Sequence, residues 1–149
     1  MPNAHARFAP SASGRWIPCP GSIPLAEQLL AEGRIEADTS GEAAKRGTAM
    51  HDASERHLLA GTDPSSYDKP LKYDGGEVSV ADWRPHVINY VEYVWSRMEE
   101  MRLIAKEDPR LVVEGKVQIY EDDCWGSVDA YWYADNILEV DDLKTGFHV

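Results

Sequence analysis

The hydrophobic period of the chain changes at Pro109, and this change constrains the fold more than any other feature of the sequence. Before this position, Val87, Val91 and Val94 recur at spacings of four and three residues, which predicts the apolar stripe of an amphipathic helix. After it, residues 111–120 largely alternate between apolar and polar side chains, which predicts a strand. Helices followed by strands indicate the α+β class.

Three helices are expected before the change of period, because each helix-forming stretch ends at a Gly or Pro stop signal. They are Ile23–Glu32, Thr39–Gly61, and a helix capped by Ser79 or Asp82 that ends at Asp108-Pro109. Thr39 and Glu42 have the spacing of a capping box at the start of the second helix. Residues 1–21 and 61–77 are rich in Pro, Gly and Ser, so these two stretches are expected to be irregular.

Three strands are expected after the change of period, and short turns join them into an antiparallel meander. Their bounds are Leu111–Tyr120, Trp125–Ala134 and Ile137–Lys144, with residues 121–124 as the first turn. Asp135 and Asn136 both tolerate positive φ, so they are candidates for a two-residue hairpin loop. Such a loop places Ala134 opposite Ile137.

The register of this hairpin also places Asp129 directly opposite Asp142 on the same face of the sheet. Lys144 shares that face because it lies two residues beyond Asp142. Two facing carboxylates repel each other, and a divalent cation between them is the natural compensation. The pattern therefore predicts a cation site, provided that no one-residue bulge changes the register. A solvated strand end that carries Asp-Leu-Lys is the alternative interpretation.

The composition narrows the class of protein. With 149 residues, of which 43% are hydrophobic, the chain is expected to form one folded domain. Its net charge of −11 counts against a broad basic surface for nucleic acid. Two cysteines do not suffice for a disulfide framework, and no apolar run approaches the ~20 residues of a membrane span. We therefore expect a cytoplasmic protein.

Four segments of the chain carry short motifs. They are Ser11–Pro20 with its Trp16 and Cys19, Gly47-Thr48-Ala49-Met50-His51, Gly126-Ser127-Val128-Asp129, and Asp142-Leu143-Lys144. This ordered set resembles the RecB-like branch of the PD-(D/E)XK nuclease superfamily, which includes phage-type and CRISPR-adaptation-type exonucleases. The resemblance extends from about Ser11 to Gly146 and implies a restriction-endonuclease-like core.

The resemblance implies a metal-dependent DNA nuclease, a hydrolase of phosphodiester bonds and more specifically an exonuclease. The implied ligands of Mg²⁺ or Mn²⁺ are His51, Asp129, Asp142 and the backbone carbonyl of Leu143. The implied catalytic residues are Asp129, Asp142 and Lys144, of which Lys144 would position the attacking water or stabilise developing charge. The hairpin register independently supports only these last three residues.

Three further side chains are candidates for the same site. Glu55 lies one turn after His51 and could support it as a hydrogen-bond partner. Glu114 could approach the metals, although a solvent-facing residue paired with Lys116 is the interpretation that we prefer. Arg46 could contact DNA at the mouth of the site, or it is an ordinary solvated helix residue.

The resemblance covers only part of the family's core. That core continues beyond the position of Lys144 with a helix that carries Q-x-x-x-Y and a further strand, which have no counterpart in this sequence. We therefore expect residues 1–149 to form a single, incomplete RecB-like nuclease domain with an irregular lead-in at residues 1–21. DNA is the expected partner, with a second chain or a second copy to complete the sheet, and no membrane.

Two cysteines are too few for the four-cysteine iron–sulfur cluster of some RecB-like nucleases, so no such cluster is expected within this chain.

Two other functions stay open. One is a catalytically inactive nuclease-like module that binds a protein partner or mimics nucleic acid, which the net charge of −11 would suit. The other is a metal-binding α+β domain with unrelated chemistry. If the protein is phage-encoded, its location is the host cytoplasm.

Overall fold

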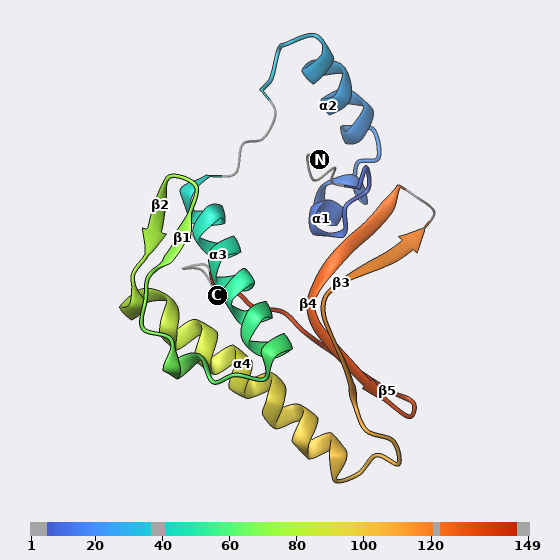
Figure 1. The fold of residues 1–149 in the computed structure, drawn as a ribbon. Helices are drawn as coiled ribbons and strands as arrows, with labels where there is room; N and C mark the ends of the chain where they lie inside the picture. The colour runs from blue at the N-terminus through green and yellow to red at the C-terminus, as the bar shows by residue number, and fades with distance from the viewer. Residues whose placement is uncertain (1–5, 37–40, 121–122, 146–149) are drawn as a thin grey trace. The chain divides into compact units, whose positions relative to one another are not determined.

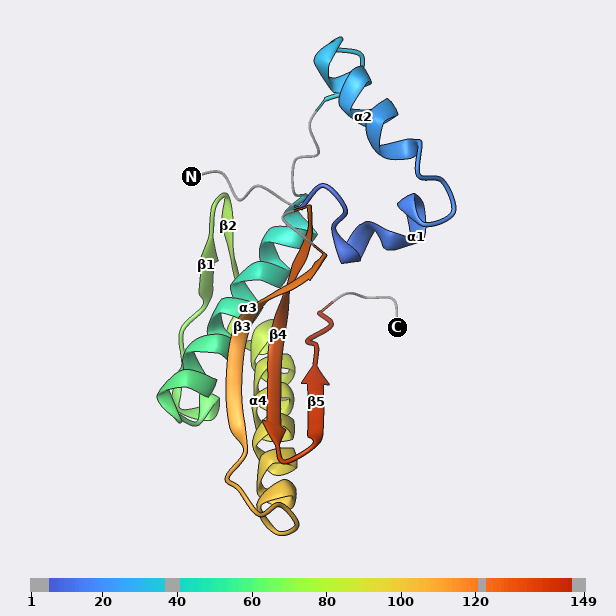
Figure 2. The ribbon, with the colours of Figure 1, turned by 90° about the vertical axis from the view of Figure 1, so that its right-hand side faces the viewer.

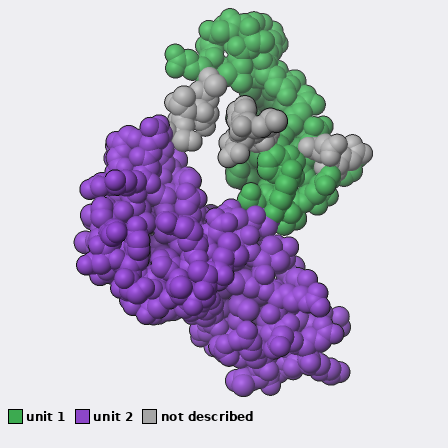
Figure 3. All heavy atoms as spheres, viewed as in Figure 1, with its two compact units in different colours: residues 1–39, 116–127 green, residues 40–115, 128–149 purple. Residues whose placement is uncertain are grey.

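The computed structural model describes residues 6–36, 41–120 and 123–145. The chain divides into two compact units, residues 1–39 with 116–127 and residues 40–115 with 128–149 (Figure 3). The predicted cap at Thr39 and residues 121–122 of the predicted first turn lie outside the described residues. All of the predicted metal ligands belong to the second unit.

The first unit begins with two short helical turns, η1 (Pro10–Ala12) and α1 (Ser13–Trp16), followed by helix α2 (Ser22–Ala31). Helix α2 confirms the first predicted helix. The prediction that residues 1–21 are irregular is wrong at the two turns. There the indole N–H of Trp16 donates to the carbonyl of Ala9 at 2.9 Å, and the Trp16 ring packs edge-on against Phe8. One aromatic side chain thus holds this segment in place.

Two long helices, α3 (Glu42–Ala60) and α4 (Val80–Arg102), pack against each other in the second unit (Figure 1). Gly61 follows α3 with a φ of 62°, which confirms the predicted end of this helix. The hydroxyl of Ser79 accepts a hydrogen bond from the amide of Asp82 and confirms the predicted cap of α4. Within the described residues, no helix is both long and apolar enough to cross a membrane.

Helix α4 ends at Arg102, six residues before the predicted end at Asp108, so this predicted boundary is wrong. Met101 is the last buried residue of its apolar stripe, and Leu103 and Ile104 are 85% and 72% exposed. Most helical stability in proteins comes from the packing of an apolar face. The helix therefore stops where that packing stops, and not at the next proline.

A small hairpin of β1 (Leu71–Tyr73) and β2 (Gly76–Val78) follows the turn η2 (Pro64–Ser66). The Pro- and Gly-rich sequence predicts an irregular stretch here, and this prediction is wrong for the hairpin. Asp74 and Gly75 form the turn, and Gly75 adopts a φ of 101° that favours glycine. Leu71 pairs with Val78 and both side chains are buried, so the hairpin is anchored in the core beside α3.

Strands β3 (Arg110–Tyr120), β4 (Cys124–Ala134) and β5 (Ile137–Asp141) form one sheet in that order (Figure 1, Figure 2). This sheet after the helices confirms the α+β class. Asp135 adopts a φ of 51° in the hairpin loop, and Ala134 pairs with Ile137, which confirms the predicted register. Strand β5 ends at Asp141, three residues before the predicted end at Lys144.

The core of the second unit forms where the apolar stripe of α4 packs against β4. Its buried residues include Val87, Val91 and Val94 of α4, and Ala130 and Trp132 of β4. Because side chains alternate along a strand, Asp129 is turned out of this core. The same alternation turns Asp141 into it, since Asp141 pairs directly with Ala130.

Asp141 is an acidic side chain in the core, with an exposed fraction of 6%. Its Oδ2 atom has no hydrogen-bond partner among the described residues. Burial raises the pKa of Asp141, the charge of Glu139 raises it further, and the charge of Arg97 opposes this. An ionised Asp141 therefore destabilises the folded chain.

Replacing Asp141 with Asn is expected to raise the free energy of unfolding at pH 7 by about 1 kcal/mol, because the amide is uncharged. The pKa of Asp141 is higher in the folded state than in the unfolded state. The wild-type chain therefore loses stability as pH rises from the unfolded-state pKa through the folded-state pKa. The gain from Asn should therefore vanish at about pH 3.5, below the unfolded pKa.

Urea unfolding at both pH values measures this difference. The matched control is Asp108→Asn, since the side chain of Asp108 is 93% exposed. An Asp141→Asn variant no more stable than the wild type at pH 7 would contradict the prediction.

Candidate metal centre

Three side chains from separate segments converge in the second unit. His51 lies on α3, Glu114 on β3 and Asp129 on β4, and one ligand atom from each lies within 4.8 Å of the other two. An imidazole nitrogen and two carboxylate oxygens suit divalent cations such as Mn²⁺ and, with more water ligands, Mg²⁺. These three residues, hereafter the cluster, form the candidate metal centre.

Asp129 is held on both of its carboxylate oxygens. Its Oδ1 atom lies 3.2 Å from Nδ1 of His51, and both side chains are largely shielded from solvent. Its Oδ2 atom accepts a hydrogen bond of 2.7 Å from the backbone N–H of Leu143. Helix α3 and the segment after β5 therefore orient Asp129 from two directions, so its carboxylate is fixed before any ligand binds.

Glu114 reaches the cluster through an unusual backbone conformation. It is a non-glycine residue in the middle of β3 with a φ of 49°, which costs roughly 1–3 kcal/mol and tends to occur at functional sites. The adjacent Gly115 lies under the ring of Tyr131, where an added Cβ would be 2.6 Å from Cε1 of that ring. The ring of Tyr131 thus requires a glycine beside Glu114. Simple strand alternation gives no signal for this feature.

The preferred interpretation of Glu114 as a partner of Lys116 is not what the structure contains. In the first unit, Nζ of Lys116 lies 4.1 Å from the centroid of the Trp125 ring. Glu114 instead joins His51 and Asp129. Its acidic side chain on the first strand is the sequence signal that makes it a candidate.

The charges of the cluster influence one another. The hydrogen bond to Asp129 raises the pKa of His51, and burial opposes this shift. Burial disfavours the ionised form of Asp129, but hydrogen bonds from His51 and the Leu143 amide outweigh burial and lower its pKa. Burial, followed by the charge of Asp129, raises the pKa of Glu114. A divalent cation would offset both carboxylates and displace the proton from His51.

Asp142 and Lys144 form an ion pair next to the cluster. Nζ of Lys144 lies 2.5 Å from Oδ2 of Asp142, and both side chains are exposed. The carboxylate of Asp142 is not among the three groups that converge, although its charge raises the pKa of His51. The structure therefore places Asp142 near the candidate centre but directs its carboxylate to Lys144.

The end of β5 accounts for this arrangement. The predicted register continues as far as Asp141, where β5 ends. Beyond this point the N–H of Leu143 turns toward Asp129, and the Leu143 side chain is buried. Asp142 therefore leaves the paired strand just where the predicted pairing with Asp129 would occur.

Tyr90 is a residue of the site that the sequence analysis does not single out. It lies buried on α4, and its hydroxyl donates a hydrogen bond of 3.2 Å to the backbone carbonyl of Asp141. Burial raises the pKa of Tyr90, and the charges of Asp129, Asp141 and Asp142 add to this shift. Tyr90 therefore remains a hydroxyl donor and ties α4 to the end of β5. Its spacing of three residues from Val87 is the available sequence signal.

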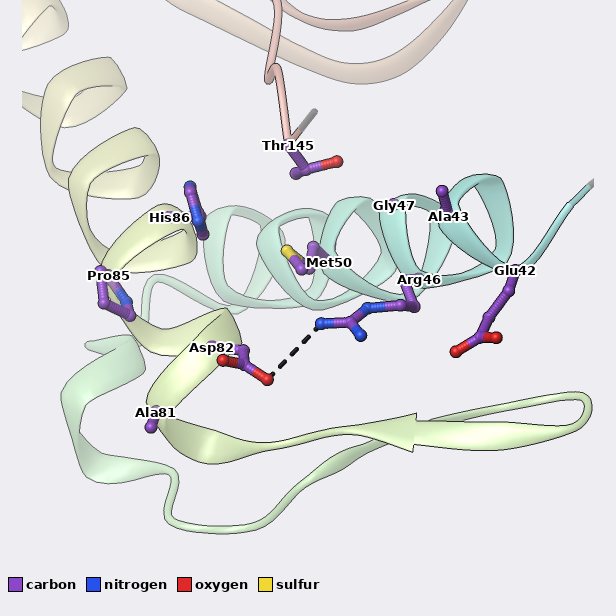
Figure 4. A pocket seen from close by; sticks show the side chains of 10 residues that line it. All are labelled: Glu42, Ala43, Arg46, Gly47, Met50, Ala81, Asp82, Pro85, His86 and Thr145. Carbon is purple, nitrogen blue, oxygen red and sulfur yellow. Dashed lines mark hydrogen bonds and ion pairs between the residues drawn. The ribbon is translucent and has the colours of Figure 1, made fainter. Parts of the chain in front are cut away.

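Glu55 and Arg46 lie on α3 with His51 but do not contact it. No hydrogen bond joins Glu55 to His51 in the described part of the chain, although the charge of Glu55 raises the pKa of Glu114. Arg46 lies five residues before His51, so it points to a different side of the helix. Its guanidinium lies 3.5 Å from Asp82 and lines a pocket of about 610 Å³ (Figure 4).

Gly47 of the helix motif permits a close approach between α3 and the segment after β5. An added Cβ at Gly47 would lie 3.1 Å from Oγ1 of Thr145, and both residues line the pocket of Figure 4. The chain that follows Lys144 is thereby held against the helix that carries His51. Spacing within the motif alone does not reveal this contact.

The cluster is expected to bind Mn²⁺. Both His51→Gln and Glu114→Gln should weaken binding at least about 10- to 100-fold, the loss that even a change of a residue supporting a ligand causes. Asp142→Asn should weaken it less, because its carboxylate is paired with Lys144. Binding should also weaken as pH falls through the raised pKa of His51, since an imidazolium is not a ligand.

Isothermal titration calorimetry with Mn²⁺ measures these effects. His57→Gln is the matched control, because His57 lies on the same helix and pairs with Thr62. Wild-type affinity in Glu114→Gln would contradict the assignment of Glu114 to the centre.

Comparison with known protein families gives a match to almost the whole sequence. The model of a family described as "Protein of unknown function (DUF2800)" matches residues 5–149. No solved structure matches the chain. Because the family match spans far more than half of the sequence, the chain belongs to the DUF2800 family.

Proposed function

We propose that this chain is a Mg²⁺- or Mn²⁺-dependent deoxyribonuclease domain that hydrolyses phosphodiester bonds from a DNA end. The observation that carries the proposal is the convergence of His51, Glu114 and Asp129 beside the Asp142–Lys144 pair. The motif order that resembles RecB-like nucleases supports the same activity. The resemblance implies His51 and Asp129 as ligands and Lys144 as the residue that positions water or stabilises developing charge.

The cluster fits the metal by its donor set. His51 and Asp129 would hold the cation, with Glu114 as a third ligand. The resemblance adds Asp142 and the Leu143 carbonyl to this set. The chemistry that a metal supplies in such a site is a lowered pKa of bound water and neutralisation of charge on the phosphate.

Lys144 would act as a cation toward the substrate. Its hydrogen bond to Asp142 raises the pKa of Lys144, burial opposes this shift, and the charges of Asp142 and Asp129 add to it. The ammonium therefore stays protonated and can donate to a phosphate oxygen or orient a water molecule. Asp142 would keep the flexible Lys144 side chain near the cluster until substrate binds.

A nuclease-like module without catalytic activity is the second candidate. Two observations favour it: the net charge of −11, and the direction of the Asp142 carboxylate away from the cluster. Such a module would bind a basic protein partner.

Under either proposal, a second chain or a second copy could pair with β5. This strand lies at the edge of its sheet and has one side without a neighbour among the described strands.

Degradation of a labelled linear DNA tests the proposed activity. The purified protein should degrade DNA with Mg²⁺ or Mn²⁺ and not with EDTA. His51→Gln, Asp129→Asn and Lys144→Ala should each lower the rate about 100-fold or more. Asp108→Asn serves as the control, because the side chain of Asp108 is 93% exposed and does not belong to the cluster.

Degradation that persists in EDTA and in Asp129→Asn would contradict the proposal. A protein without activity that binds a basic partner in a salt-sensitive way, unchanged by Asp129→Asn, would favour the second candidate.

A further inference from the structure

We propose that a basic groove beside α3 binds the phosphodiester backbone of the nucleic acid strand whose scissile bond lies at the metal centre. The groove carries Arg56, Lys69 and Lys72, and none of these residues belongs to the motifs. This inference rests on the proposed function for its link to catalysis, but binding to the groove can be tested without cleavage.

The groove lies in the second unit between α3 and the segment that leads into β1. It has a volume of about 370 Å³, with Arg56 on the helix side and Lys69 and Lys72 on the opposite side. A second hollow of about 180 Å³ shares Arg56 and Tyr67 with it and extends it along the helix. The buried Leu71 lies between the two lysines in sequence and anchors this side, so the lysines flank a fixed point of the core.

The charge of the groove contrasts with that of the chain. The chain has 26 acidic and 15 basic side chains, whereas this groove is lined by three cations and one carboxylate, Asp52. Glu77 lies opposite Lys72 in the register of β1 and β2, but among the described residues no ion pair joins these two. A local excess of positive charge in an acidic protein is the electrostatic footprint of a site for anions.

The three cations are also free of ion pairs within the described residues. Most other described basic side chains are paired with carboxylates. These paired residues are Arg7, Arg34, Lys45, Arg46, Arg84, Arg97, Arg102 and Lys144. Arg56 donates its Nε–H to the backbone carbonyl of Asp52, which fixes the guanidinium and leaves its terminal nitrogens for a ligand. Unpaired cations that face one hollow are suited to phosphates, because no internal ion pair must break.

The groove adjoins the candidate metal centre across α3. Asp52 lines the groove and follows His51 in the helix, about 100° around the helix axis. The charge of Asp52 also raises the pKa of Glu114, which places the two carboxylates in one electrostatic neighbourhood. A nucleic acid strand that lies in the groove therefore runs along α3, the helix that carries His51.

An aromatic ring completes the groove. Tyr67 lines it and is packed against the buried Trp83, with ring centroids 5.8 Å apart. This packing holds the Tyr67 ring in one position. Apolar and aromatic surface between cations is typical of grooves that bind single strands, because sugars and bases pack on it while phosphates contact Lys and Arg.

The test compares two charge-matched triple variants. In the first, Arg56, Lys69 and Lys72 are replaced with Gln, and in the second Arg102, Lys106 and Arg110 are replaced with Gln. Fluorescence anisotropy measures the affinity of each variant for a labelled single-stranded oligonucleotide in EDTA, over a series of salt concentrations. Because EDTA removes divalent metal, neither cleavage nor the metal centre contributes to the signal.

The groove variant should bind at least about 10-fold more weakly than the wild type. The slope of log affinity against log salt should fall by about 2, which corresponds to three lost phosphate contacts on a single strand. The control variant should keep most of the affinity and slope. Circular dichroism verifies that both variants are folded.

Equal losses in the two variants would overturn the proposal, because net charge and not the groove would then govern binding. Undiminished binding by the groove variant, or no binding by the wild type, would overturn it as well. The same measurements with DNA and with RNA of the same sequence identify which polymer supplies the phosphates. A loss of affinity for either polymer in the groove variant, but not in the control variant, supports the groove.

The outcome for the groove is separable from the outcome for the nuclease. Groove-dependent binding by a protein that never cleaves DNA supports the groove and contradicts the proposed activity. Metal-dependent cleavage at the wild-type rate and affinity in the groove variant retains the activity and overturns the groove.

Discussion

The packing of α4 against β4 is the interaction on which the rest of the second unit depends. It buries Val91 on the helix and Trp132 on the strand, and it thereby sets the phase of side chains along β4. That phase turns Asp129 out of the core, and the hairpin register turns Asp141 into it. One strand pairing thus buries the acid at Asp141 and leaves Asp129 on the face of His51.

The net charge of the chain does not describe how its acidic and basic side chains are distributed in the fold. Two carboxylates and an imidazole converge at one point, where burial and the charge of Asp129 disfavour the ionised form of Glu114, and a divalent cation would offset both carboxylates. The basic residues divide in a corresponding way. Most of the described ones are held in ion pairs, while those of the basic groove are free and lie one helix face away from His51. A net charge of −11 is thus compatible with a nucleic acid substrate, provided that the anions and cations are separated in this manner.

Much of the fold follows from local signals in the sequence. The Ser79 cap and the Gly61 stop define helix ends because each depends on the conformation of a few neighbouring residues. The Asp135–Asn136 loop defines the register of β4 and β5 for the same reason. The end of α4 is different, because it depends on where the core stops supporting the helix, at Met101, and not on Pro109. The hairpin of β1 and β2 requires packing on α3 to outweigh its irregular composition.

The sequence by itself determined the α+β class and the register of the last hairpin, because periodicity and turn chemistry act over short distances. The same register made Asp129 a candidate ligand, whereas His51 was a candidate only through the resemblance to RecB-like nucleases. Tertiary structure alone decided which third group joins them. Glu114 enters the cluster through a positive φ beside a glycine covered by Tyr131, and Asp142 turns to Lys144 where β5 ends. Both outcomes depend on contacts between residues far apart in the chain, whose energies outweigh the local preferences that a sequence pattern records.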